Sequence, residues 1–203
     1  MSESIENWFE KVAMASNMKT ETVPFSDPQN DDWQVTDGEI VRKDRRYYKV
    51  VFVKTIDDSE TFYKPMIEPF SADGTYGALI LLKVNGKYLV QAKAETGNRT
   101  PGKMVLTTTV QSSYENINAK KISYADMLEN LDDRLKVKSV PQDAGMLYHK
   151  NNRYIFAEIE EENFEILPNF FLATREDIAS LAKEGLVSEH LLQMLGLLWA
   201  MGL

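Results

Sequence analysis

The stretch that decides the fold runs from Ala78 to Glu95 and reads Ala-Leu-Ile-Leu-Leu-Lys-Val-Asn-Gly-Lys-Tyr-Leu-Val-Gln-Ala-Lys-Ala-Glu. An apolar run leads into the dipeptide Asn85-Gly86, which is typical of a two-residue turn between antiparallel strands. The sequence therefore predicts a β-hairpin. Because strand residues two apart point the same way, its second strand places an amide, an ammonium and a carboxylate in a row on one face: Gln91, Lys93 and Glu95.

A second polar row is expected between Met104 and Ser113, where hydroxyl and amide side chains follow one another. We predict one strand over residues 104–111. Two neighbouring strands of this kind can form a polar pocket for a ligand covered in hydroxyl groups. A plainer interpretation stays open, since Thr107 to Thr109 suit any edge strand and a Lys-x-Glu pair on a strand is usually exposed to solvent.

The rest of the chain alternates between helical and strand-like patterns. The predicted elements are a helix over 4–18, strands over 34–41 and 47–55, a hairpin loop at 57–60, a helix starting at Ser123, a hairpin of 146–150 with 153–160 around Asn151-Asn152, and helices from Thr174 to Gly185 and from Ser188 to Leu198. Together they predict an α+β protein with a mixed or antiparallel β-sheet and flanking helices. We expect an N-terminal helix and linker arm over residues 1–32 and a single domain over 33–203.

Composition excludes several kinds of protein. The 203 residues include no cysteine, so disulfides, thiolate metal sites and cysteine nucleophiles are excluded, and the net charge of −8 argues against nucleic-acid binding. His149 and His190 lack metal-ligand spacing, so we expect structural or surface roles for them and no metal site.

Glutamates interrupt the N-terminal apolar positions, and the apolar segment 191–203 is shorter than the roughly 20 residues that span a membrane. We therefore expect a cytoplasmic protein.

Longer motifs give the chain a family resemblance. Gln91-Ala-Lys-Ala-Glu-Thr-Gly-Asn98, followed by Thr109-Val-Gln111, resembles the central motif of the NDP-hexose 2,3-dehydratases of deoxysugar biosynthesis. Further blocks in the same order resemble the family's entry segment, its pre-strand proline turn, two central blocks and its ending: Trp33 to Tyr48, Lys64-Pro65-Met66, Gln142 to Gly145, Lys150 to Tyr154, and Phe170 to Thr174. The resemblance covers residues 33–198.

The resemblance implies a Nudix-like fold and a nucleotide-sugar substrate, with thymidine diphosphate as the expected nucleotide. It implies elimination of water across C2–C3 of an NDP-4-keto-6-deoxyhexose by general acid–base chemistry, without a redox cofactor or a metal. The glutamate-rich helix with which Nudix hydrolases bind Mg²⁺ has no counterpart here, because Glu160-Glu161-Glu162 reads as a solvated turn. Metal-dependent pyrophosphate hydrolysis is therefore not expected.

The sequence also departs from the family pattern. Family members carry two tandem copies of the unit, whereas this sequence shows one. Residues 112–116 lack an expected arginine, Asp143 stands in place of a glutamate, and Arg42 stands in place of a histidine. A non-catalytic subunit that binds nucleotide-sugars is therefore the alternative to an enzyme. A homodimer would restore the two-copy architecture, and we expect its interface at the apolar C-terminal segment or at the N-terminal helix bearing Trp8 and Phe9.

The resemblance also suggests roles for individual residues. Glu95 is the first candidate for the catalytic acid or base, Asp143 is the next, and Lys93 is expected to polarise the ketone or hold a phosphate. The expected substrate-binding residues carry hydrogen-bonding side chains, with the Arg153 fork suited to a diphosphate: Gln91, Asn98, Thr109, Gln111, Asn151, Arg153 and Arg42. We predict that Gln91, Lys93, Glu95, Asn98 and Gln111 share one pocket.

Overall fold

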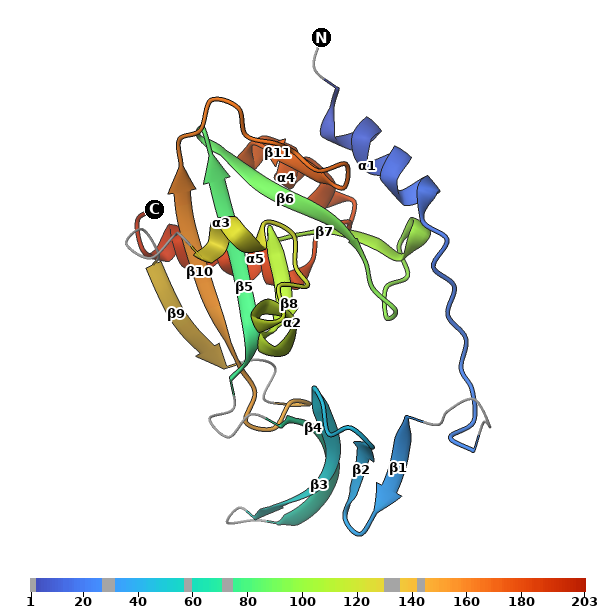
Figure 1. The fold of residues 1–203 in the computed structure, drawn as a ribbon. Helices are drawn as coiled ribbons and strands as arrows, with labels where there is room; N and C mark the ends of the chain where they lie inside the picture. Colours follow the sequence, from blue (N-terminus) through green and yellow to red (C-terminus); the bar gives the residue numbers. More distant parts are fainter. Residues whose placement is uncertain (1–2, 27–31, 57–59, 71–74, 130–135, 142–144) are drawn as a thin grey trace.

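The computed structural model describes residues 3–26, 32–56, 60–70, 75–129, 136–141 and 145–203. Within them the chain forms two β-sheets with helices on both faces of the larger one (Figure 1). The smaller sheet has the strand order β1-β2-β3-β4 and contains β1 (Trp33–Thr36), β2 (Glu39–Arg42), β3 (Tyr48–Ile56) and β4 (Thr61–Pro69).

The larger sheet has the order β11-β6-β5-β10-β9, with β7 paired to β6 and β8 paired to β5. Its strands are β5 (Thr75–Val84), β6 (Lys87–Ala94), β7 (Met104–Thr107), β8 (Val110–Ser113), β9 (Lys136–Pro141), β10 (Asn151–Ile159) and β11 (Phe170–Ala173). Only β10 and β5 run parallel among the described pairs. The predicted α+β class with a mixed sheet is confirmed.

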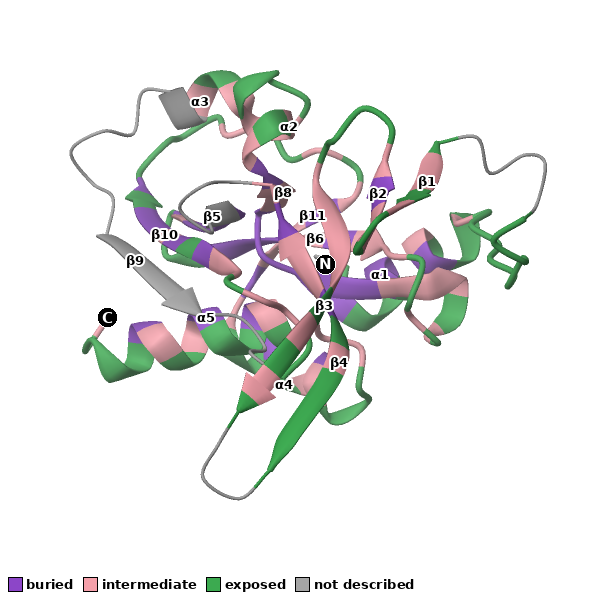
Figure 2. Ribbon diagram, turned by 90° about the horizontal axis from the view of Figure 1, so that it is seen from below, coloured by how far each residue is buried: buried purple, intermediate pink, exposed green. Residues whose placement is uncertain are grey.

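Helices cover the larger sheet. They are α1 (Ile5–Ala15), α2 (Tyr114–Asn118), α3 (Ala125–Glu129), α4 (Arg175–Lys183) and α5 (Glu189–Ala200), with a short 3-10 turn at Pro101–Lys103. The core of α1, α4 and α5 packs on the face that bears Leu79 and Leu81, whereas residues near α2 and α3 pack on the face that bears Ile80 and Leu82. Because β5 is buried on both faces, it reads as a continuous apolar run. Figure 2 shows this buried centre and the exposed outer part of the β3–β4 hairpin.

Local signals placed several elements correctly. Asn85 and Gly86 both have positive φ, 48° and 81°, and connect β5 to β6 as the hairpin prediction required. Ser4 caps α1, Thr174 and Asp177 form a capping box on α4, and Ser188 caps α5. The loop predicted at 57–60 connects the antiparallel strands β3 and β4, although residues 57–59 lie outside the described part.

Three predicted elements near the small sheet and β10 were wrong. The strand expected over 34–41 is the hairpin β1–β2, because Gly38 takes a φ of 87° that turns the chain. Lys64-Pro65-Met66 lies inside β4 instead of forming a turn. The hairpin expected around Asn151-Asn152 does not exist, because both residues already pair with β9 and β5 as the start of β10.

The strand predicted over 104–111 is also two strands, and this correction positions the site. β5 and β6 pair directly only near their turn, and beyond Leu82 and Leu89 they separate to admit β8 and β7. The buried Thr109 hydroxyl lies at this fork, where it accepts a hydrogen bond from Leu82 N at 2.9 Å and donates one to the Leu89 carbonyl. The Thr109 side chain thus replaces the backbone hydrogen bonds that β5 and β6 no longer form with each other where they separate.

Candidate active site

A cavity of about 470 Å³ lies beside this fork. It is walled by strands β5, β6, β8 and β10, by the start of α5, by α2 and the loop after it, and by the residue before β3. The lining residues are mainly polar: Tyr47, Ala78, Leu79, Gln91, Lys93, Glu95, Thr109, Val110, Gln111, Ser112, Ser113, Asn116, Lys121, Ile122, Ser123, Lys150, Asn152 and His190.

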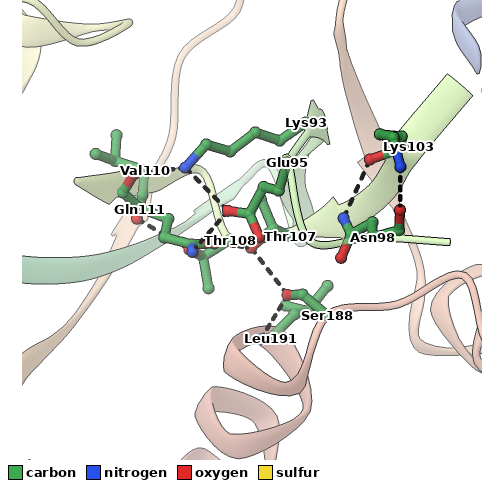
Figure 3. Close-up of polar contacts among 10 residues, drawn as sticks. All are labelled: Lys93, Glu95, Asn98, Lys103, Thr107, Thr108, Val110, Gln111, Ser188 and Leu191. Atoms are coloured by element: carbon green, nitrogen blue, oxygen red, sulfur yellow. Dashed lines mark hydrogen bonds and ion pairs between the residues drawn. The ribbon is translucent and has the colours of Figure 1, made fainter. Parts of the chain in front are cut away.

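The predicted polar row of β6 faces this cavity. Gln91, Lys93 and Glu95 all line it, and the Lys93 ammonium lies 3.2 Å from Glu95 Oε1. Each of these two side chains is 33% exposed, so the pair is neither a free surface ion pair nor a buried one. Lys93 also donates to the backbone carbonyl of Gln111 at 3.1 Å, and this hydrogen bond connects the polar row of β6 to β8. Figure 3 shows these contacts.

A chain of hydrogen bonds from α5 ends on the same carboxylate (Figure 3). Leu191 N donates to the Ser188 hydroxyl at 3.2 Å, and Ser188 donates to Thr107 Oγ1 at 2.9 Å. Thr107 donates to Gln111 Oε1 at 2.8 Å, so the amide nitrogen of Gln111 points toward Glu95 Oε1 and donates to it at 2.9 Å. Every donor in the chain points toward Glu95, so these hydrogen bonds hold its carboxylate in one position.

The charges around the cavity are mostly positive. Lys93, Lys121 and Lys150 line it together with a single carboxylate, Glu95, among the described lining residues. Burial lowers the pKa of Lys150 from its ordinary value. A chain with a net charge of −8 thus places an excess of ammonium groups around one polar cavity, which suits an anionic ligand.

A second cavity of about 350 Å³ adjoins the first and shares Glu95 and His190 with it. Its other lining residues include Asn98, Thr100, Ser188 and Glu189. Asn98 donates its side-chain amide to the Lys103 carbonyl at 3.1 Å and accepts the Lys103 ammonium at its own carbonyl. The prediction that Asn98 shares the pocket of Lys93 was therefore wrong, because Asn98 holds the loop after β6 and faces the neighbouring cavity.

The other predicted site residues separate into two groups. Thr109 and Gln111 line the first cavity, whereas the structure places Arg42, Asn151 and Arg153 outside both cavities. Arg153 is exposed because it alternates with the inward-facing Asn152 along β10, and Arg42 forms a two-pronged contact with Asp44 at 3.0 Å in the small sheet. Asp143 lies outside the described residues.

The cavity residues that sequence reasoning missed include three charged or titratable side chains and one buried amide: Lys121, Lys150, His190 and Asn152. Lys150 and Asn152 belong to a motif that carried the resemblance, and strand alternation would have found Asn152 had β10 been placed correctly. His190 was expected to be structural or at the surface, yet it lines both cavities. Lys121 lies in a loop without a local signal.

Two further features concern the described residues only. They contain no group of three or more histidine, aspartate or glutamate side chains placed to hold a metal ion. Their helices are all too short or too polar to cross a membrane.

Fold and site together define a protein with a polar, lysine-rich cavity around one carboxylate, that of Glu95, which Lys93 and Gln111 hold in place. The sequence profile of the NDP-hexose 2,3-dehydratase family matches residues 2–192, and the chain belongs to this family. It is also similar to a dTDP-4-dehydro-6-deoxy-alpha-D-glucopyranose 2,3-dehydratase of Streptomyces violaceoruber, with 25% identity over 190 residues. The match covers 88% of this chain and 42% of that relative, so the chain spans less than half of the relative's length.

Proposed function

We propose that the chain is a sugar-nucleotide dehydratase that eliminates water across C2–C3 of an NDP-4-keto-6-deoxyhexose. Family membership supports the reaction, and the name of the Streptomyces relative supports a thymidine diphosphate sugar. The observation that carries the proposal is the position of Glu95 in a polar cavity, held by Lys93 and Gln111.

The chemistry needs a base at C3. The C4 ketone acidifies the C3 proton, so a base can remove it and form an enolate, after which the C2 hydroxyl departs as water. The enol product rearranges to a 3,4-diketo sugar. Both contacts of the Glu95 carboxylate go to Oε1, so Oε2 is the oxygen left for the substrate proton among the described contacts. Gln91 can donate to sugar hydroxyls without changing charge.

The lysines suit the other half of the substrate. A nucleotide-sugar carries two negative phosphates. Lys121 and Lys150 line the cavity, and Glu95 is the only carboxylate among the described residues that line it. Ammonium groups bind phosphate oxygens through charge-assisted hydrogen bonds. They take the diphosphate role that the sequence had given to Arg153.

Incubation with dTDP-4-keto-6-deoxyglucose tests the activity, with the diketo product trapped by reduction and identified by mass spectrometry. Glu95→Gln should lower the rate at least about a hundredfold, because general acid–base catalysis contributes about that much or more. Glu158→Gln is the matched control, since Glu158 also pairs with a lysine, Lys83 at 2.8 Å, but lies on the exposed side of β10. An unchanged rate in Glu95→Gln would contradict the assignment and make Asp143 the next candidate base.

A non-catalytic nucleotide-sugar binding subunit is the second candidate. The observation that favours it is the length of the match, which spans 42% of the catalytic relative. The same incubation decides between the two functions. Tight binding of the nucleotide-sugar without product would favour the subunit, whereas product formation by the chain alone would exclude it.

A further inference from the structure

His190 stands at the junction of the two cavities. It is the second residue of α5, after the N-cap Ser188, and lines both cavities together with Glu95. Four charged side chains act on it: Lys150 and Lys93 from across the cavity, Glu95 from the end of β6, and Glu189 from its own helix. Among the described residues, His190 is not part of any group of side chains placed to hold a metal ion. Its side chain and the candidate catalytic carboxylate of Glu95 line the same two cavities.

The two nitrogens of this imidazole have different surroundings. Nδ1 is shut off from solvent and has no hydrogen-bond partner among the described residues. A buried N–H without an acceptor is costly, so the proton of the neutral ring belongs on Nε2. Because Nδ1 is buried while the ring lines the cavities, the ring meets them through its Nε2 edge. The histidine therefore presents a hydrogen-bond donor to a ligand.

The same surroundings keep the ring neutral. Burial lowers the pKa of His190 from its ordinary value of 6.5, and Lys150 lowers it further, against the opposing charges of Glu95 and Glu189. The first turn of a helix also disfavours a cation. A neutral N–H donor does not form a salt bridge with the Glu95 carboxylate, and so it leaves that group free to act as a base.

We propose that His190 is a catalytic residue that donates its Nε2–H to the C4 oxygen of the sugar and stabilises the enolate formed there. This role rests on the proposed function. Glu95 takes the C3 proton, the electron pair of the C3–H bond forms the enolate, and His190 hydrogen-bonds to its oxygen without losing a proton. The enolate then collapses, the C2–O bond breaks, and the proton on Glu95 leaves with the hydroxyl as water.

The arrangement also reassigns a role. Lys93 was expected to polarise the ketone, but its ammonium already contacts Glu95 and the Gln111 carbonyl. We therefore assign the contact with the ketone oxygen to His190, which lines both cavities together with Glu95. Preorganised donors directed at developing oxyanions are among the strongest catalytic effects in enzymes.

Nitrogen-15 NMR of the free chain tests the tautomer without any substrate. The chain has two histidines, so His149→Gln leaves the His190 imidazole alone in the spectrum. We expect the Nε2–H tautomer, mostly neutral at pH 6.5. A proton on Nδ1, or an imidazolium at that pH, would overturn the proposal.

Kinetics test the role. His190→Leu should lower the dehydration rate about a hundredfold, the usual effect of removing one oxyanion donor. His190→Gln should lose less, because its amide still donates. His149→Gln is the matched control, since His149 is exposed near Glu68 and outside both cavities. Melting curves and thymidine diphosphate affinity show whether each variant is folded.

A His190→Leu variant that binds thymidine diphosphate and dehydrates the sugar at the parent rate would overturn the role and leave the proposed function standing. Equal losses in the Leu and Gln variants would also overturn it, because a donor would then make no difference. An unmodified chain without turnover would overturn the proposed function and this role together, whatever the tautomer.

Discussion

Gln111 Nε2 lies 2.9 Å from Glu95 Oε1, although one residue is on β8 and the other follows the end of β6. Thr107 fixes the orientation of the amide, because its hydroxyl donates to Gln111 Oε1 and so directs the nitrogen toward the carboxylate. The fork between β5 and β6 makes this contact possible, since it brings β7 and β8 alongside the polar row of β6.

We predict that Thr107→Val lowers the free energy of unfolding by about 1–3 kcal/mol. The Thr107 hydroxyl is fully buried, and its removal takes a hydrogen-bond partner from the Gln111 and Ser188 side chains. Urea unfolding measures the loss. Thr61→Val on the exposed edge strand β4 is the control and should stay within about 0.5 kcal/mol of the parent. An equal effect in both variants would contradict the role of the Thr107 hydroxyl.

Thr109 at the fork gives a second prediction. Thr109→Val removes the hydroxyl that satisfies Leu82 N and the Leu89 carbonyl, and each buried backbone group left unpaired costs about 1–3 kcal/mol. Thr109→Ser keeps the hydroxyl and should retain most of the stability. If the valine and serine variants unfold at the same urea concentration, the fork does not depend on this hydroxyl.

The lysines of the cavity predict how the chain binds nucleotides. Lys121→Gln and Lys150→Gln should each weaken thymidine diphosphate binding about tenfold, since a hydrogen bond to a charged group contributes roughly 1.5–3 kcal/mol. Isothermal titration calorimetry measures the affinity. Lys83→Gln is the control, because Lys83 pairs with Glu158 away from the cavity. Unchanged affinity in both cavity variants would place the diphosphate elsewhere.

The Lys150 ammonium should also make this affinity depend on pH. A lysine carries its charge below its pKa, and burial lowers the pKa of Lys150 from its ordinary value of 10.5. Diphosphate affinity should therefore fall with rising pH before ordinary lysines lose their charge, and Lys150→Gln should abolish that early fall. The same titration curve in the parent and in Lys150→Gln would count against a charged Lys150 at the diphosphate.

We predict a homodimer that uses the outer face of α5. Trp199 is 78% exposed there and Leu192 is 48% exposed, and closed two-fold pairing is the commonest way to cover such a surface. Trp8 and Phe9, which suggested the N-terminal helix as the alternative interface, are buried in the chain's own core, so we favour α5.

Light scattering of the parent and of Trp199→Glu tests this prediction. The parent should have the mass of two chains, and the variant the mass of one. Met14→Glu is the control, because Met14 is 76% exposed on α1, away from this face. A monomeric parent at micromolar concentrations would rule out the dimer.

Residues close in sequence determined much of the fold. The Asn85-Gly86 turn, the capping residues Thr174 and Ser188, and the apolar periodicity of α1 were readable because turns, caps and amphipathic faces depend on near neighbours. The polar row of Gln91, Lys93 and Glu95 was equally local, since strand alternation alone puts these side chains on one face.

Only the tertiary structure decided which distant residues join that row. The fork at Thr109 separates two strands that the sequence presents as a plain hairpin, and it depends on contacts between residues 20 or more positions apart. His190 reaches the cavity because α5 packs against the sheet, whereas Arg153 faces outward because it alternates with the inward-facing Asn152 along β10. The sequence alone thus determined the local row of Gln91, Lys93 and Glu95, and packing between distant elements decided the rest of the site, because strand partners and helix placement depend on the whole core.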